Sequence, residues 1–339
     1  MIETTPSAPA ALTKKDFASD QQVKWCPGCG DYSILAALQM TLPKLGIPRE
    51  KFAVISGIGC SSRFPYYMNT YGFHTIHGRA LPVATGVKAA NPDLQVWVIT
   101  GDGDGLSIGG NHLIHALRRN VDLKVILFNN EIYGLTKGQF SPTSVQGIKT
   151  KTSPMGSIDA PLSPSSFALA CGAGFVARTT DNDVKHLSAV LEAAAKFKGS
   201  AFVEVMQNCV IFNDGAHASF AATDTRKVNA LYMEHGQPLA WDGATKGVFG
   251  KGFGVETKEI TDANRSQVIV HDLQEETGAL AWNLAQFENP ERPVPLGVFR
   301  AVERTPYHEL MDNQIKQARS AKGSGDLNKL LHDGFTWKV

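Results

Sequence analysis

The chain has 339 residues, and its 33 Lys and Arg nearly balance its 32 Asp and Glu, so the formal net charge is +1. Such a balance gives no electrostatic reason to expect a nucleic acid or an anionic membrane as the partner. Hydrophobic residues make up 43% of the chain, which excludes general disorder. No apolar run approaches the roughly 20 residues of a membrane-spanning helix, and the N-terminus lacks the pattern of a secretory signal. We therefore expect a soluble, cytoplasmic protein.

From residue 21 to about residue 210, short apolar segments alternate with segments of helical periodicity. This alternation predicts an α/β fold in which a mainly parallel sheet is covered by helices on both faces. The predicted helices are 33–45, 82–90, 106–119, 165–171 and 184–196. The predicted strands are 52–55, 95–100, 123–128, 175–177 and 201–206.

The two ends of the chain follow other patterns. Residues 1–20 are rich in Ala, Thr, Ser and Pro, and we expect a mobile segment there. Residues 215–339 lose the alternation and carry one predicted strand at 267–270 and one predicted helix at 279–287. We expect this part to be an irregular extension that wraps the core or forms an interface. Residues 21–214 then make up the α/β domain.

Unusual polar residues follow two of the predicted strands. Gly101, Asp102 and Gly103 come after one strand, where glycines allow a ligand close to the backbone and the next helix favours phosphate at its start. Asp102 is a hard oxygen ligand suited to Mg²⁺. One helix and one strand later the chain reaches Asn129 and Asn130, on a strand end that we expect to be adjacent. Asp102 and Asn130 could therefore hold Mg²⁺ against a diphosphate. The alternative is that Gly-Asp-Gly is an ordinary turn and Asn-Asn an ordinary loop, without a ligand.

The chain has five cysteines, an odd number that favours a metal or redox site over a disulfide framework in a reducing compartment. Cys26 and Cys29 form a C-x-x-C pair, while Cys60 and Cys209 each follow a predicted strand. Four thiolates from three segments suit a [4Fe–4S] cluster. A structural zinc ion, which usually draws on two close pairs, and thiols without metal are the alternatives. Cys171 lies among Ala and Leu and is expected to be a buried small hydrophobic residue.

The Gly-Asp-Gly and Asn-Asn pattern resembles the thiamine diphosphate signature. The longer segments GDGDGLSIGGNHLIHALRRN, FNNEIYGLTKGQFSPT, WCPGCGDYS and GIGCSSR resemble the β subunit of 2-oxoacid:ferredoxin oxidoreductases, over about residues 21–225. The resemblance implies a thiamine diphosphate-binding fold in which Asp102, Asn130 and the main chain of Ile132 bind the metal beside Gly101 and Gly103. It also assigns the four cysteines to the cluster. For Asp104, a further acid nearby, a structural role is favoured over a ligand role.

Further residues of the substrate pocket follow from the same resemblance. The family carries a basic residue near the substrate at the position of Arg63, whose guanidinium could clamp a carboxylate, the alternative being a surface arginine. His77 lies in a segment that resembles one near the cofactor, whereas His74 is expected to be structural. Lys137 and Gln139 follow the metal loop, and we expect them to line the same pocket.

The resemblance implies an oxidoreductase that interconverts a 2-oxoacid, coenzyme A and oxidised ferredoxin with an acyl-CoA, CO₂ and reduced ferredoxin. 2-Oxoglutarate is the first candidate substrate, and pyruvate and branched-chain acids stay open. Thiamine enzymes need an activating Glu from a second domain, which this sequence does not offer. We therefore expect an α or fused γα subunit to supply it, in a dimer of heterodimers. A self-sufficient thiamine enzyme and a non-catalytic iron–sulfur carrier are the rival hypotheses.

Overall fold

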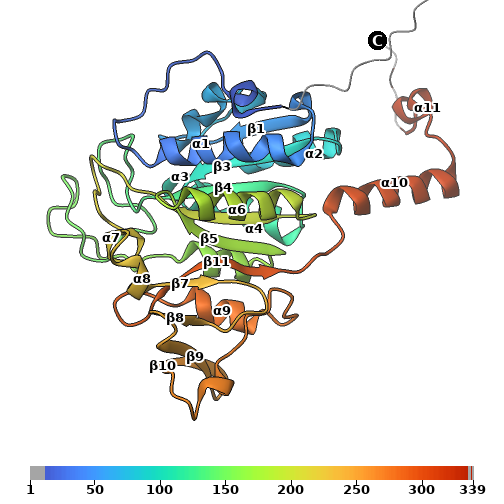
Figure 1. The fold of residues 1–339 in the computed structure, drawn as a ribbon. Coiled ribbons are helices and arrows are strands. Elements are labelled where there is room, and N and C mark those ends of the chain that lie inside the picture. Colours follow the sequence, from blue (N-terminus) through green and yellow to red (C-terminus); the bar gives the residue numbers. More distant parts are fainter. Residues whose placement is uncertain (1–11, 335–336, 338–339) are drawn as a thin grey trace, which may run out of the picture.

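The computed structural model describes residues 12–334 and residue 337. Its centre is an eight-stranded sheet with the strand order β2-β1-β3-β4-β6-β5-β11-β7 (Figure 1). The strands are β1 (Phe52–Ser56), β2 (Tyr71–His74), β3 (Gln95–Gly101), β4 (Lys124–Asn129), β5 (Phe175–Thr180), β6 (Ala201–Met206), β7 (Ala230–Met233) and β11 (Val294–Ala301). Neighbouring strands are parallel except for β5 and β11. The predicted mainly parallel sheet is therefore confirmed.

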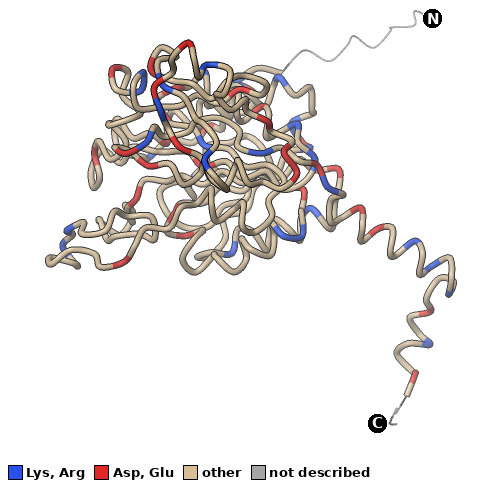
Figure 2. Tube along the Cα trace, turned by 90° about the horizontal axis from the view of Figure 1, so that it is seen from below, with Lys and Arg blue, Asp and Glu red and all other residues tan. Residues whose placement is uncertain are grey.

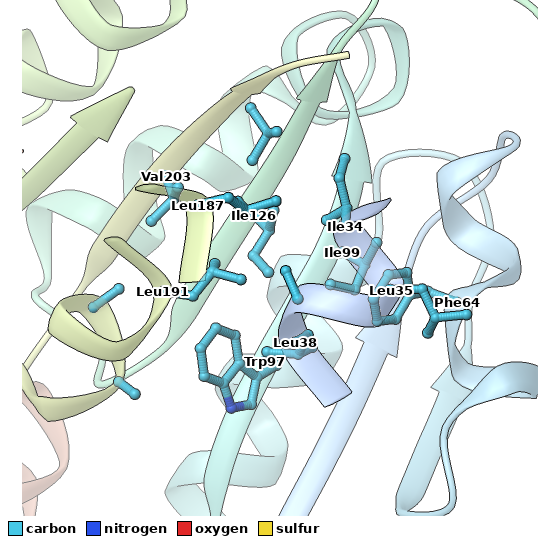
Figure 3. Close-up of a cluster of buried hydrophobic side chains, with 14 of the residues drawn as sticks. Ile34, Leu35, Leu38, Phe64, Trp97, Ile99, Ile126, Leu187, Leu191 and Val203 are labelled. Atoms are coloured by element: carbon cyan, nitrogen blue, oxygen red, sulfur yellow. The ribbon is translucent and has the colours of Figure 1, made fainter. Parts of the chain in front are cut away.

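Helices cover both faces of this sheet, as predicted. On one face, α1 (Asp31–Thr41) and α6 (Val184–Lys196) bury their apolar sides against the strands (Figure 3). The other face is covered by α2 (Ala80–Ala90), α4 (Gly110–Arg118), α5 (Pro164–Ala170) and α9 (Ala279–Ala285). Successive strand residues alternate between the two cores, because side chains on a strand point to opposite faces. Trp97 and Ile99 lie in the first core, and Val96 and Val98 lie in the second.

The predicted helix 106–119 is wrong at its start. The structure has a short helix α3 (Asp102–Leu106) and then a break before α4. The break accommodates a close approach of the segment after β2, because a Cβ added to Gly78 would lie only 2.5 Å from the main-chain nitrogen of Gly109. Within the Gly-Asp-Gly-Asp-Gly run, Gly101 ends β3 and the other four residues belong to α3.

The C-terminal part contributes two strands to the main sheet that the sequence pattern does not predict, β7 and β11. A second sheet has three strands, β8 (Ala240–Trp241), β9 (Lys246–Lys251) and β10 (Gly254–Glu259). The predicted strand 267–270 is not formed, since Arg265–Gln267 is a 3-10 helix (η5) and Val268 and Val270 make only isolated bridges. The remaining helices are α7 (Ala218–Ala221), α8 (Arg226–Asn229), α10 (Tyr307–Lys322) and α11 (Leu327–Leu331).

Figures 1 and 2 show α10 and α11 extending away from the sheet as an arm, and neither helix buries a residue. In the N-terminal part, residues 1–11 of the predicted mobile segment lie outside the described residues. Phe17, at the end of a 3-10 helix η1 (Lys14–Phe17), is fully buried with its ring 5.5 Å from that of Phe52. The other 3-10 helices are η2 (Leu42–Leu45), η3 (Arg49–Lys51) and η4 (Ser61–Tyr67). Within residues 12–334, every helix is too short or too polar to cross a membrane.

Candidate active site

Four strand ends that carry polar residues meet at one edge of the sheet. β1, β3, β4 and β6 are parallel neighbours in that order, so the segments after them lie side by side. Asp102 and Asn130 therefore follow adjacent strands, as the spacing predicts. One cavity opens at this edge. It is lined by Asp31, Ile58–Ser61, His77, Gly101–Asp104, Phe128, Asn130 and Ile132–Thr136.

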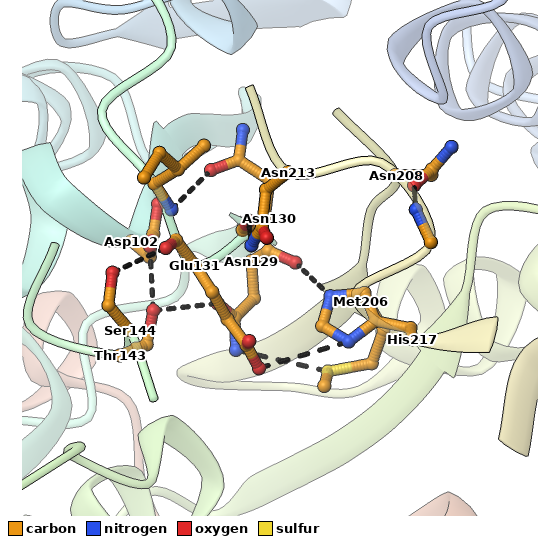
Figure 4. Close-up of polar contacts among 12 residues, drawn as sticks. Asp102, Asn129, Asn130, Glu131, Thr143, Ser144, Met206, Asn208, Asn213 and His217 are labelled. Atoms are coloured by element: carbon orange, nitrogen blue, oxygen red, sulfur yellow. Dashed lines mark hydrogen bonds and ion pairs between the residues drawn. The ribbon is translucent and has the colours of Figure 1, made fainter. Parts of the chain in front are cut away.

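Asp102 is buried in the wall of this cavity, with 3% of its surface exposed. Its Oδ2 accepts a hydrogen bond from the hydroxyl of Thr143 at 2.6 Å (Figure 4). The hydroxyl of Ser141 donates to the same oxygen, also at 2.6 Å. Burial raises the pKa of Asp102 to about 6, and the two hydroxyl donors only partly offset that effect. No ion pair of the described residues involves Asp102. The cavity therefore presents a buried acid that has no cationic side chain beside it.

The two asparagines after β4 have different surroundings. Asn129 is buried, and its amide donates to Oε1 of Glu204 at 2.9 Å, while Glu204 is paired with Arg178 at 2.9 Å. Asn130 lines the cavity, and its Oδ1 accepts a hydrogen bond from the main chain of Ile132 at 3.2 Å. Asn129 is thus part of the buried scaffold, and Asn130 is the asparagine that faces the cavity.

Asp104 is buried and holds neighbouring segments together. Its Oδ1 accepts hydrogen bonds from the main-chain nitrogens of Ile58 at 3.2 Å and Gly78 at 2.8 Å. Its Oδ2 accepts one from Thr100 at 2.9 Å. The ring of His77 is largely exposed, with Nδ1 3.8 Å from Asp104. Through these contacts Asp104 fixes the segments that form two sides of the cavity.

Three of the four predicted cluster cysteines are half-buried and lie near one another, and Cys26 is exposed. A Cβ added to Gly134 would lie 3.6 Å from Sγ of Cys209 and 3.7 Å from Sγ of Cys60, so the two sulfurs flank this glycine. Burial raises the pKa of Cys60 to about 12, with further increases from Asp31, Cys209 and Cys26. This environment favours the protonated thiol of Cys60 unless a positive centre lies beside it.

Cys29 belongs to the same group of sulfurs. Its pKa is raised, mainly by burial and then by the charge of Asp31, with contributions from Cys209 and Cys60. The amide of Gln207 donates to its sulfur at 3.3 Å. No three His, Cys, Asp or Glu side chains in the described part of the chain are arranged to hold a single metal ion.

A second cavity, of about 510 Å³, adjoins the first and shares Ile58, Gly59 and Leu135 with it. Arg63 and Lys24 line this cavity. The hydroxyl of Tyr67 accepts hydrogen bonds from Nε of Arg63 at 3.0 Å and from the main chain of Lys24 at 2.9 Å. The second cavity therefore holds two cationic residues that are anchored on one tyrosine.

The structure separates some predicted residues and adds others. Lys137 is exposed, has a backbone φ of +77°, and lines neither cavity, so its role stays a prediction.

Sequence reasoning missed Ser141 and Thr143, although both lie in the Ser-Pro-Thr-Ser run after the asparagine loop. It also missed Asp31, whose pKa burial raises to about 7, and Glu131, whose pKa burial raises to about 8. Both acids lie inside the quoted motifs, Asp31 in WCPGCGDYS and Glu131 in FNNEIYGLTKGQFSPT, and this position could have indicated them.

Comparison with known proteins connects this geometry to a cofactor class. Residues 57–205 match the family model "Thiamine pyrophosphate enzyme, C-terminal TPP binding domain". This range runs from the segment after β1 to the end of β6 and contains Asp102, Asn130 and Cys60. The matched part therefore includes most of the lining of the first cavity.

Relatives match the chain well beyond that range. It is 50% identical to 2-oxoglutarate oxidoreductase subunit KorB of Mycobacterium tuberculosis over 330 residues, which are 96% of this chain and 88% of that protein. A 2-oxoacid:ferredoxin oxidoreductase subunit beta of Saccharolobus solfataricus is 49% identical over 56% of this chain and 63% of its own length. The structure of a Magnetococcus marinus 2-oxoglutarate:ferredoxin oxidoreductase, with 2-oxoglutarate, coenzyme A and succinyl-CoA bound, superposes with a TM-score of 0.75, 32% identity and 98% coverage of both chains.

Proposed function

Because the chain belongs to the family of β subunits of 2-oxoacid:ferredoxin oxidoreductases, we propose that it binds thiamine diphosphate with Mg²⁺ and one [4Fe–4S] cluster. Its complex would interconvert a 2-oxoacid, coenzyme A and oxidised ferredoxin with an acyl-CoA, CO₂ and reduced ferredoxin. When bound, thiamine diphosphate would supply the electron sink for loss of CO₂, and the cluster would accept electrons one at a time. The observation that carries the proposal is the shared cavity edge of Asp102, Asn130 and Cys60.

The first cavity fits a metal–diphosphate group by its donor set. Asp102 offers a carboxylate and Asn130 an amide oxygen from adjacent strand ends, and the main chain of Ile132 lies in the same wall. These are the hard oxygen donors that Mg²⁺ prefers. A Cβ added to Gly103 would lie 2.1 Å from the ring of Tyr133, so this position admits only glycine. Asp104 and His77 complete the wall, with Asp104 as a positioning residue.

The four thiols fit a multi-iron centre better than a zinc ion. A structural zinc ion usually draws on two close pairs of ligands, whereas this chain offers one close pair, Cys26 and Cys29, and two single cysteines. The sulfurs of Cys60 and Cys209 flank Gly134. Cys26 and Cys29, which belong to the C-x-x-C segment before α1, complete the group. A [4Fe–4S] cluster bound by these residues would also keep the thiolates deprotonated.

The second cavity supports an anionic substrate with two carboxylates. Arg63 could grip one carboxylate in two parallel hydrogen bonds, and Lys24 adds a second positive charge to the same cavity. A 2-oxoacid with a single carboxylate, such as pyruvate, would leave one of these cations without a partner. 2-Oxoglutarate is therefore the proposed substrate, in keeping with the names of the relatives.

The chain would supply one part of a shared active site in the cytoplasm. A thiamine enzyme needs a Glu that activates the cofactor, and both Glu131 and Glu204 are committed to the scaffold near His217 and Arg178. The activating Glu would come from an α or fused γα subunit in a dimer of heterodimers. Coenzyme A would take the acyl group, and ferredoxin would take the electrons.

The test is anaerobic co-purification of the chain with its partner subunit, followed by iron and thiamine assays and a panel of 2-oxoacids. We expect four irons and one thiamine diphosphate for each copy of this chain, and turnover of 2-oxoglutarate only in the complex. Iron without thiamine would instead identify a non-catalytic electron carrier. Robust turnover by the chain alone would identify a self-sufficient thiamine enzyme.

A further inference from the structure

The segment after β6, residues 207–217, carries Cys209 and also contacts the loop after β4. The main-chain nitrogen of Gln207 donates to the carbonyl oxygen of Asn129 at 2.9 Å. The ring of His217 reaches the same oxygen with Nε2, also at 2.9 Å (Figure 4). Because a carbonyl oxygen only accepts, Nε2 must carry the proton of this buried ring.

Asn213 makes the corresponding contact one residue further along the loop. Its side-chain amide donates to the carbonyl oxygen of Asn130 at 2.9 Å (Figure 4). The main-chain nitrogen of Asn213 donates in turn to the carbonyl of Cys209 at 3.0 Å, so this side chain is held in a turn that starts at the cysteine. The carbonyls of both asparagines are thus bound by the segment that holds one sulfur of the proposed cluster.

Packing between the two loops leaves little freedom for one to move without the other. Gly134 lies against the sulfur of Cys209, and a Cβ added to Gly138 would lie 2.9 Å from the ring of Phe212. The loop after β4 therefore contacts the 207–217 segment at Cys209 and Phe212 as well as at Asn213. A displacement of Cys209 would be passed to the backbone of Asn130 through this close packing.

We propose that Asn213 and His217 are positioning residues that couple the cluster site to the Mg²⁺ site. They hold the backbone of Asn129 and Asn130 in place, so that the side chain of Asn130 stays directed at the metal. This inference rests on the proposed function, since it takes the metal role of Asn130 and the cluster role of Cys209 from it. Neither residue would touch the substrate or a cofactor.

The test compares Asn213→Ala with Asn229→Ala in the purified complex with the partner subunit. Asn229 is a matched control, because its amide also donates to a main-chain carbonyl, that of Ser219 at 2.7 Å, away from the cavity. Loss of one amide–carbonyl hydrogen bond should raise the Mg²⁺ concentration for half-maximal binding of thiamine diphosphate by roughly 5- to 20-fold in Asn213→Ala. Asn229→Ala should stay within twofold of the wild type.

A second readout follows the cluster itself. The electron paramagnetic resonance spectrum of the reduced cluster should change in Asn213→Ala and not in Asn229→Ala. His217→Gln, which keeps a donor for the carbonyl of Asn129, should bind Mg²⁺ more tightly than His217→Leu. This pair supplements Asn213→Ala because a variant at the buried His217 could fail to fold.

The outcomes separate the coupling from the function on which it rests. A wild-type complex that contains no thiamine diphosphate or no iron overturns the proposed function, and the coupling with it. A wild-type complex that contains both, together with Mg²⁺ binding by Asn213→Ala within twofold of the wild type, overturns the coupling alone. Equal weakening in Asn213→Ala and Asn229→Ala also overturns it, because the effect would then be general.

Discussion

Asp122, which is partly buried, and two buried acids of the first cavity differ in their partners. Asp122 contacts Lys124 at 2.7 Å and Lys88 at 2.8 Å, and these charges outweigh burial and lower its pKa to about 2. At the edge of the first cavity, burial raises the pKa of Asp102 to about 6 and that of Asp31 to about 7. Neither cavity acid has a Lys or Arg partner among the described ion pairs.

Asp122 is therefore a structural acid, whereas Asp102 and Asp31 lack both a cation and the main-chain donors that hold Asp104. An unpaired buried carboxylate costs free energy, and a folded chain keeps one where function requires it. Asp122 finds its positive charge within the chain, whereas Asp102 would find it in Mg²⁺. Arg63 is the opposite case, a cation of the second cavity that has no acid partner in the described ion pairs. It would pair with a carboxylate of the substrate.

The largest effect is expected at the cysteines, where the proposed cluster supplies the missing positive centre. Cys60→Ala should remove or degrade the iron–sulfur chromophore and abolish ferredoxin reduction, and the same holds for Cys26, Cys29 and Cys209. Cys171→Ala is the matched control, because this thiol is also half-buried but lies apart from the others. Visible spectra and iron assays check the series. A cluster that needs Cys171 and tolerates loss of Cys209 would refute the ligand assignment.

The acid of the first cavity comes next. Asp102→Asn keeps the shape and removes the charge that Mg²⁺ would meet, so thiamine diphosphate binding should weaken by at least about 100-fold. The cluster spectrum should survive, because its ligands are other residues. The cofactor-free variant should unfold at a higher temperature than the cofactor-free wild type, because a buried unpaired charge is gone. Unchanged thiamine content and an unchanged unfolding temperature would contradict the distinction between the two groups of acids.

Asp122 tests the other group. Asp122→Asn leaves Lys124 and Lys88 buried without a counter-charge, which should cost about 3–5 kcal/mol of unfolding free energy. Because the pKa of Asp122 is lowered in the folded state, the unfolded chain binds more protons between about pH 4 and pH 2, and stability falls as the pH falls through that window. The variant should lack this part of the acid transition. Urea denaturation at several pH values measures it.

A matched surface pair provides the control for Asp122. Asp93 lies 3.6 Å from Lys51, and its side chain is 78% exposed. Asp93→Asn should change the unfolding free energy by less than about 1 kcal/mol, because exposed ion pairs contribute little. Equal losses from both variants would mean that burial does not distinguish these acids.

The sequence predicts this edge of the sheet well because its determinants are local. Strand–helix alternation places Asp102 and Asn130 on adjacent strand ends, and the comparisons bear out the family that those motifs indicate. β11 escapes prediction because it pairs with β5, more than a hundred residues earlier, and with β7, about sixty residues earlier, so no neighbouring pattern marks it. Ser141 and Thr143 escape for the same reason, since their hydroxyls meet Asp102 only in the folded chain.

The last prediction concerns Arg63, a cation of the second cavity that would pair with a carboxylate of the substrate. Arg63→Ala should lower kcat/KM for 2-oxoglutarate by a factor that corresponds to about 2–5 kcal/mol of lost transition-state stabilisation, since the bound carboxylate would lose its charged partner. Arg63→Lys keeps the charge but loses the two-pronged hydrogen bonding, so the loss should be smaller. Two cases differ in which carboxylate Arg63 holds. If Arg63 holds the carboxylate of 2-oxoglutarate that is remote from the keto group, pyruvate should be affected less than 2-oxoglutarate. If it holds the carboxylate next to the keto group, both acids should be affected alike. Kinetics with both acids, at matched iron and thiamine contents, decide between these cases. Wild-type values for both acids would mean that Arg63 is a surface residue and that the second cavity does not bind the substrate through it.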